Sequence, residues 1–416
     1  MTTAPPTPSA LESLPVELLH RILFYLQTQD ILSNRLTSST LAAVGIEYLQ
    51  AFSICFKREH LHRLIDIANH PIISKRARSL YYYGRPLDSL RNFDNWSKLP
   101  PCPILRSSGS LRTRQPSPPE DLERAYDEYI RIRKDQHRIV QENFDVHCFT
   151  ELLRCCPALD SVIIDQSVDC GKSSTRELPH TAFREARIDP KCDHVWRISP
   201  EGCSTRPTSV LARALSRSQR SIRSLTLVGQ GYLDVFLHEL ASPQMSHLAQ
   251  GLRELSIYRT MRKSDERVDV GSDASTMEYL LSRVPNLEVL KIREARSAYF
   301  YLGSESSPRS ARLRELDLAD FHLREDDLVW VLKPHFSTLE RLSLKSTSDR
   351  TYDWSYVDQM LQGRFTRLRS LNYRGMQLNE EDLQHFVLSV RRSGISGALR
   401  RCQIVMRADG FCRVEM

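Results

Sequence analysis

The segment Leu313-Arg-Glu-Leu316-Asp-Leu318 has the pattern apolar-x-x-apolar-x-apolar, and Leu368-Arg-Ser-Leu371-Asn-Tyr373 repeats it. Eight such triples follow residue 158: Leu159/Val162/Ile164, Ile222/Leu225/Leu227, Leu252/Leu255/Ile257, Leu287/Leu290/Ile292, Leu313/Leu316/Leu318, Leu339/Leu342/Leu344, Leu368/Leu371/Tyr373 and Leu399/Cys402/Ile404. Their first residues are separated by 63, 30, 35, 26, 26, 29 and 31 residues. One triple can arise by chance, but eight triples, six of them at near-regular spacing, indicate an internal repeat.

Each triple predicts a short strand, because alternate residues of a strand point to one side and can enter a shared core. The segments between the triples have helical spacing of apolar residues at 210–215, 277–284, 327–332, 356–361 and 382–390. We therefore predict an α/β fold in which parallel strands and outer helices stack as a leucine-rich-repeat solenoid over residues 120–416. The solenoid is expected to be irregular and to carry a loop insertion near residues 166–207.

We expect irregular repeats because this chain lacks residues that leucine-rich repeats usually have after the strand. Asn or Cys normally follows the strand and satisfies backbone groups there. The positions concerned hold Gln230, Thr260, Ala295, Phe321, Thr347, Met376 and Arg407. If the strands line a concave face, its exposed positions include Arg223, Arg253, Glu254, Arg314, Arg341 and Arg369. Most of these residues are basic, which favours an acidic or phosphorylated target.

A helical module is predicted over residues 11–52, after a Pro-rich disordered tail at 1–10. Apolar residues recur every four positions from Leu14 to Leu26, and Pro15 suits the first turn of a helix. Thr28 or Asp30 can cap a second helix, and a third is expected over 40–52. Because three short helices bury little surface, the module should expose an apolar patch for a partner.

Residues 53–119 are predicted to form a helix near 61–68, a short strand at 77–82 and a basic linker rich in Pro and Ser. Between residues 71 and 115 there are nine Lys or Arg and two Asp or Glu. A solvated linker explains this charge better than a nucleic-acid surface, since basic residues interleaved with aromatic ones do not recur elsewhere. A charged helix is expected from residue 120 to about 140.

The composition is that of a globular protein, with 41% hydrophobic and 26% charged residues among 416. The sequence shows neither a signal peptide nor a long apolar stretch, so we expect a cytoplasmic or nuclear protein that binds no membrane and no nucleic acid. Reduced thiols are the expectation for the ten cysteines.

Cofactor and metal motifs are weak. Cys170-Gly-Lys-Ser173 lacks the earlier glycine of a phosphate-binding loop. The candidate metal ligands are Cys170, His180, Cys192, His194 and Cys203. Their spacings match no paired-ligand pattern, so we expect no metal, no cofactor and no catalytic residues.

Residues 13–36, SLPVELLHRILFYLQTQDILSNRL, closely resemble the F-box motif. The Leu14-Pro15 start, Glu17-Leu18, Ile22-Leu23, Leu26 and Asp30-Ile31 stand where that motif has its defining residues. The third helix departs from the motif, because Ser38-Ser39-Thr40 stand where bulkier residues are common. The following stretch, with Leu61-His-Arg-Leu64 and His70-Pro71, looks like the F-box proteins of filamentous fungi.

This resemblance implies a substrate-recognition subunit of a Skp-cullin-F-box ubiquitin ligase, which has no chemistry of its own. It implies that a Skp-family adaptor docks on the module, and that the repeats bind an unknown protein substrate. By position, the adaptor surface or module core would comprise Leu14, Pro15, Leu18, Ile22, Leu23, Leu26, Ile31 and Leu32.

Three alternatives stay open. The chain could be an F-box and leucine-rich-repeat interaction scaffold without a role in ubiquitination. The helical module could be a cap on the solenoid. The chain could also be a hydrolase or metal enzyme, which stoichiometric metal would support. Binding of the adaptor, with or without turnover of a target, separates the first from the leading hypothesis.

Overall fold

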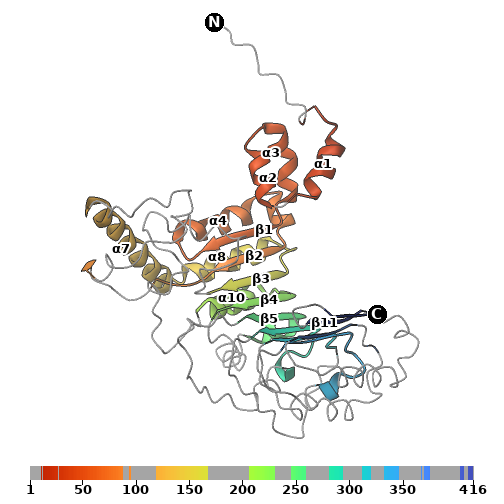
Figure 1. Ribbon diagram of the computed structural model, residues 1–416. Coiled ribbons are helices and arrows are strands. Elements are labelled where there is room, and N and C mark those ends of the chain that lie inside the picture. Colours follow the sequence, from red (N-terminus) through yellow and green to blue (C-terminus); the bar gives the residue numbers. More distant parts are fainter. Residues whose placement is uncertain are drawn as a thin grey trace.

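The strands of the computed structural model join into one sheet of eleven strands in the order β1-β2-β3-β4-β5-β6-β7-β8-β9-β11-β10 (Figure 1). The structure describes residues 11, 13–26, 28–87, 93–94, 119–166, 206–229, 245–258, 281–293, 312–319, 332–345, 367, 370–374, 403–406 and 411–415. The parallel strands are β1 (Ala51–Cys55), β2 (Ser79–Tyr83), β3 (Ser161–Asp165), β4 (Ser224–Val228), β5 (Glu254–Tyr258), β6 (Val289–Arg293), β7 (Glu315–Ala319), β8 (Arg341–Lys345) and β9 (Ser370–Arg374). Each strand from β1 to β8 pairs with the next strand in the chain, whereas β9 pairs with β11 on its other side.

Helices precede and connect these strands. They are α1 (Val16–Phe24), α2 (Thr28–Arg35), α3 (Ser39–Gly45), α4 (Arg58–Asn69), α5 (Ile73–Arg76), α7 (Pro119–Glu142), α8 (Phe144–Cys155), α10 (Arg206–Ser218) and α12 (Ser246–Gly251), with short 3-10 turns η1 (Ile46–Tyr48) and η4 (Lys333–His335). The predicted helices near 61–68, 120–140 and 210–215 lie within α4, α7 and α10. Residues 281–283 are helical, whereas 327–331, 356–361 and 382–390 lie outside the described residues.

The predicted α/β class with parallel strands is confirmed, and seven of the eight predicted triples carry parallel strands. Their apolar positions stand in register: Leu225 lies opposite Val162 and Leu255, and Leu227 lies opposite Ile164 and Ile257. The eighth triple was predicted wrongly as a parallel strand. Its strand β10 (Gln403–Met406) runs antiparallel to β11 (Phe411–Glu415), which runs antiparallel to β9.

The parallel sheet also begins earlier than predicted. The expected helix over 40–52 is wrong, because α3 ends at Gly45 and β1 starts at Ala51. Leu49/Phe52/Ile54 and Ala77/Leu80/Tyr82 have the same apolar-x-x-apolar-x-apolar pattern, and Phe52 pairs with Leu80 and Ile54 with Tyr82. The short strand predicted at 77–82 is present as β2, but its place in the parallel sheet was not predicted, and the strand at 51–55 was missed. Residues 51–83 therefore contribute two strands to the sheet.

The main core lies on one face of the sheet. There the inward positions of β1 to β8 meet the apolar sides of α4, α8, α10 and α12. Leu225, Leu255, Leu290 and Leu316 are each at most 1% exposed. Because neighbouring strands lie about 4.8 Å apart, the inward side chains form continuous columns along the sheet.

A second core covers the opposite face, but only over β1 to β3. Cys55, Tyr81 and Tyr83 point away from the main core and pack with Tyr129 and Ile132 of α7. The Gln136 side chain of α7 accepts from the Leu87 N–H at 2.8 Å and donates to the Phe56 carbonyl at 2.8 Å. Thus α7 is one layer of the fold and shields this end of the sheet.

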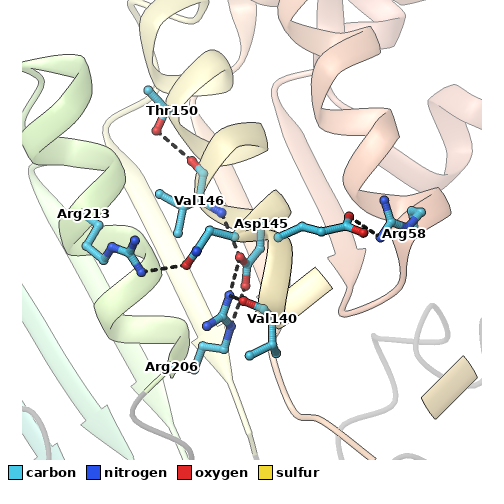
Figure 2. Close-up of polar contacts among 9 residues, drawn as sticks. Arg58, Val140, Asp145, Val146, Thr150, Arg206 and Arg213 are labelled. Atoms are coloured by element: carbon cyan, nitrogen blue, oxygen red, sulfur yellow. Dashed lines mark hydrogen bonds and ion pairs between the residues drawn. The ribbon is translucent and has the colours of Figure 1, made fainter. Parts of the chain in front are cut away.

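A buried ion pair joins α8 to α10 (Figure 2). Arg206 donates to both carboxylate oxygens of Asp145, at 2.9 Å and 2.7 Å, and the side chain of Asp145 is fully buried. Asn143, in the left-handed region at φ 51°, connects α7 to α8, and its side chain accepts from Arg213 of α10 at 3.0 Å. Arg58 of α4 donates to Asp135 and Glu142 of α7. These contacts fix four helices relative to one another.

The His60 side chain accepts a hydrogen bond from a backbone N–H of the edge strand β1. The Cys55 N–H donates to His60 Nδ1 at 3.2 Å, so the imidazole must be neutral at that nitrogen. Burial, assisted by Arg63 and Lys57, lowers the pKa of His60 from 6.5 to about 4.

We predict a loss of stability on acidification that depends on His60. The unfolded chain takes up a proton near pH 6.5 but the folded chain only near pH 4, so the free energy of unfolding should fall as the pH is lowered through this window. The His60→Gln variant keeps an acceptor but cannot titrate. Urea unfolding at pH 7 and pH 4.5 should show a smaller acid loss for this variant, and equal losses would contradict the assignment.

Removal of Arg206 should destabilise the fold strongly. Arg206→Met leaves the Asp145 carboxylate buried and unpaired, which costs about 3–5 kcal/mol. The Asp145→Asn/Arg206→Met double variant should recover part of that loss. Arg154→Met, which removes an exposed pair with Glu151, is the matched control and should change the stability little, because solvent screens exposed pairs. Urea denaturation measures all three, and equal losses for Arg206 and Arg154 would refute the role of the pair.

Candidate protein-docking surfaces

Helices α1 to α3 stand at the β1 end of the sheet (Figure 1) and form a small core of their own. Its buried side chains are Leu19, Leu23, Ile31, Leu41, Val44 and Leu49. Phe52 of β1 and Ile73 of α5 pack against it. The helical module is therefore built directly onto the first strand.

Local sequence signals explain where these helices begin. Pro15, with φ −52°, precedes α1, and Glu17 in the first turn complements the helix dipole. Ser38 caps α3, because its side-chain oxygen accepts from the Leu41 N–H at 3.2 Å.

Hydrogen bonds between side chains and neighbouring helices stabilise the helical module. His20 Nδ1 and the Tyr48 hydroxyl are hydrogen-bonded at 2.9 Å, and burial followed by the charge of Glu47 raises the pKa of Tyr48. Arg35 Nε of α2 donates to the Ala42 carbonyl of α3 at 3.2 Å. A Cβ at Gly45 would lie 2.7 Å from Arg35 Cγ, so the close approach of α2 and α3 needs glycine there.

The apolar arc of α1 is wider than the module core can cover. Leu19 and Leu23 are buried one turn apart, whereas Leu18 and Ile22 are 45% and 38% exposed. Tyr25, 76% exposed, follows Leu18 by seven residues and extends the exposed stripe. Since successive helical residues are rotated by about 100°, this stripe lies beside the buried one. We call Leu18, Ile22 and Tyr25 the α1 stripe.

The structure divides the eight predicted adaptor residues by burial. Leu23 and Ile31 lie in the module core, and Leu14 and Leu26 pack against it while half-buried. The exposed members are Pro15, Leu18, Ile22 and Leu32.

Four further exposed apolar residues were absent from the predicted set: Val16, Phe24, Tyr25 and Leu36. Helical spacing alone could have found two of them, because Tyr25 follows Leu18 by two turns and Leu36 follows Leu32 by one turn.

A charged surface lies on the sheet face opposite the main core, from β4 to β8. Five ion pairs link neighbouring repeats there: Arg223–Glu254 at 3.5 Å, Arg253–Glu288 at 3.1 Å, Lys291–Glu315 at 2.8 Å, Arg293–Asp317 at 3.2 Å and Arg341–Glu315 at 2.5 Å. Arg223, Arg253 and Glu288 directly precede β4, β5 and β6, and the other partners lie on the strands. Of the candidate target residues, Arg223, Arg253, Glu254 and Arg341 take part in these pairs, Arg314 is exposed, and Arg369 lies outside the described residues.

Three of the described cysteines are buried thiols. Burial raises the pKa of Cys55 and Cys148 to about 12 and of Cys156 to about 11, so these thiols stay protonated. Within the described ranges, no group of three His, Cys, Asp or Glu is arranged to hold a metal ion. The candidate ligands from Cys170 to Cys203 and the Cys170–Ser173 motif lie outside those ranges. None of the described helices is long and apolar enough to cross a membrane.

Comparison with known proteins does not assign the chain to a family. No family model matches the sequence, and a search of curated proteins returned no significant match.

Proposed function

We propose that this protein is an F-box protein that serves as the substrate-recognition subunit of a Skp-cullin-F-box ubiquitin ligase. The helical module would dock on a Skp-family adaptor, and the sheet and its helices, an irregular leucine-rich-repeat solenoid, would hold the target. The observation that carries the proposal is the exposed α1 stripe within the segment that resembles the F-box motif.

The stripe favours a protein partner on energetic grounds. Burial of a Leu or Ile side chain contributes about 1.5–3 kcal/mol, and the stripe exposes two such side chains beside Tyr25. Isolated exposed apolar residues are ordinary, but a stripe along one helix marks an interaction site. The polar contacts of His20 and Arg35 hold the helices that present it.

The order of the strands supports the solenoid part of the proposal. From β1 to β9 every strand pairs in parallel with its neighbour in the chain. The described helices α4, α8, α10 and α12 pack on the face of the main core, whereas α7, which lies between β2 and β3, packs on the other face. Among the described residues α7 covers that other face only over β1 to β3, so a target would contact it at β4 to β8.

In this function the chain supplies binding and placement. The adaptor would connect the module to a cullin and a RING protein, and the bound target would be brought to the ubiquitin-conjugating enzyme there. Holding the target near the ubiquitin-conjugating enzyme accelerates ubiquitin transfer, because the two then react within one complex and need not meet by diffusion. We assign no acid, base or nucleophile to this chain.

Docking can be tested by co-expression with a Skp-type adaptor. The wild-type chain should form a one-to-one complex, and Leu18→Asp/Ile22→Asp should weaken it at least about a hundredfold, since about 1.4 kcal/mol corresponds to a tenfold change in affinity. Both positions are exposed, so the variant should still fold. Binding is measured by calorimetry and folding by circular dichroism.

Val16→Asp is the matched control. Val16 is 48% exposed on the same helix but rotated about 200° from Leu18 and about 180° from Tyr25, so the added charge lies away from the α1 stripe. This variant should bind like the wild type. Loss of binding with Val16→Asp but not with the double variant would move the docking face elsewhere. A folded wild-type chain that binds no adaptor would reduce the module to a cap on the sheet.

The alternative role as an interaction scaffold predicts the same adaptor complex. It differs in the cell, where the ligase subunit should shorten the lifetime of its bound target only when Leu18 and Ile22 are intact. Pulse-chase measurement of captured proteins, with wild type and the Leu18→Asp/Ile22→Asp variant, decides between the two. Equal lifetimes with both chains would favour the scaffold.

A further inference from the structure

Among the described helices, α7 packs on the sheet face opposite the main core, and it covers only β1 to β3. Its Tyr129 and Ile132 pack on Tyr81 and Tyr83. Beyond β3, the outward positions of β4 to β6 hold half-buried Thr226, Ser256 and Lys291. A partner on this face would therefore meet a polar surface bordered by α7.

In every ion pair of this face the cation is the more exposed member. The side chains of Arg293 and Arg341 are 46% and 64% exposed, whereas those of Asp317 and Glu315 are 10% and 16% exposed. The carboxylates lie close to the sheet and the guanidinium groups lie above them. The charge presented outward is consequently positive.

Three cations share two carboxylates at β6 to β8. Glu315 pairs with both Lys291 and Arg341, and Asp317 pairs with Arg293. The Arg293 guanidinium also lies 5.2 Å from the centre of the Tyr258 ring, which orients it. A guanidinium has five N–H donors, more than these pairs use. We call Lys291, Arg293 and Arg341 the basic cluster.

We propose that the basic cluster binds an acidic segment of a partner protein, through carboxylate or phosphoryl groups. This inference rests on the proposed function, since it names the chemical class of the target. Charge-assisted, bidentate hydrogen bonds from arginine suit both groups. The strands from β4 to β8 span about 19 Å, because neighbouring strands lie about 4.8 Å apart, and about six residues of extended chain cover that distance.

The test uses the full chain and labelled ten-residue peptides in fluorescence anisotropy. One peptide is rich in Glu, one carries phosphoserine at the same positions, and one has Gln there. The Glu and phosphoserine peptides should bind and the Gln peptide should not. Binding should weaken as salt is raised from about 50 to 200 mM, since exposed charges are screened. Comparison of the two acidic peptides shows which group is the better ligand.

Variants locate the site. Lys291→Gln/Arg293→Gln/Arg341→Gln should weaken binding at least tenfold. Lys75→Gln/Arg154→Gln/Arg217→Gln removes the same charge from exposed positions on helices of the other face and should leave binding unchanged. Equal effects of the two triple variants would overturn the proposal.

A variant that binds the acidic peptides more tightly cannot be explained by damage to the fold. Glu315→Gln removes the carboxylate that Lys291 and Arg341 share, so the acidic peptides should bind several-fold more tightly. Glu59→Gln, at an exposed position on α4, is the control and should change nothing. Unchanged or weaker binding by Glu315→Gln would contradict the role of the basic cluster.

Two further outcomes are informative. Single-stranded RNA that binds more tightly than either peptide, and loses affinity in the basic-cluster variant, would overturn the acidic-protein assignment in favour of a nucleic acid. Failure of the peptides to bind a chain that still captures the adaptor would remove this inference alone. Loss of adaptor binding with peptide binding intact would instead remove the proposed function.

Discussion

Two columns of apolar side chains run along the sheet and hold the protein together. One passes through Leu225, Leu255 and Leu290, and the other lies two residues further along each strand. They can be continuous because the strands are parallel and in register. Every helix that packs on this face, from α4 to α12, contacts the columns, so the positions of the helices depend on them.

Both faces of the sheet are covered over β1 to β3. The main core lies on one face, and α7 lies on the other. The buried Asp145–Arg206 pair and the contacts of Arg58 hold α7, α8 and α10 in place around these strands. The helical module packs on this part of the sheet, since Phe52 of β1 contacts both the module core and the main core.

The two candidate surfaces use different physical chemistry. The α1 stripe is apolar, so its partner would gain mainly from removal of side chains from water. The face from β4 to β8 is charged, and its pairs are already partly satisfied within the chain. A partner there would have to compete with water and with these pairs, which gives selectivity by charge more than raw affinity.

Much of the strand pattern was predictable because alternation within a strand is a local property. The triples from Leu159 to Tyr373 predicted seven strands, and the strand at 77–82 was predicted as well, but the strand at Leu49/Phe52/Ile54 was missed because a helix was expected there. The reversed strand β10 could not be predicted, since an apolar pattern is the same for a parallel and an antiparallel strand.

The sequence by itself determined where apolar residues recur and, through Pro15 and Ser38, where two helices begin. Only the tertiary structure decided that Leu23 is buried while Leu18 and Ile22 are exposed, because burial depends on which neighbouring helix covers that side. It also decided the pairing of Asp145 with Arg206, 61 residues apart, and the covering of β1 to β3 by α7. Such contacts come from packing between distant segments, which a local pattern does not contain.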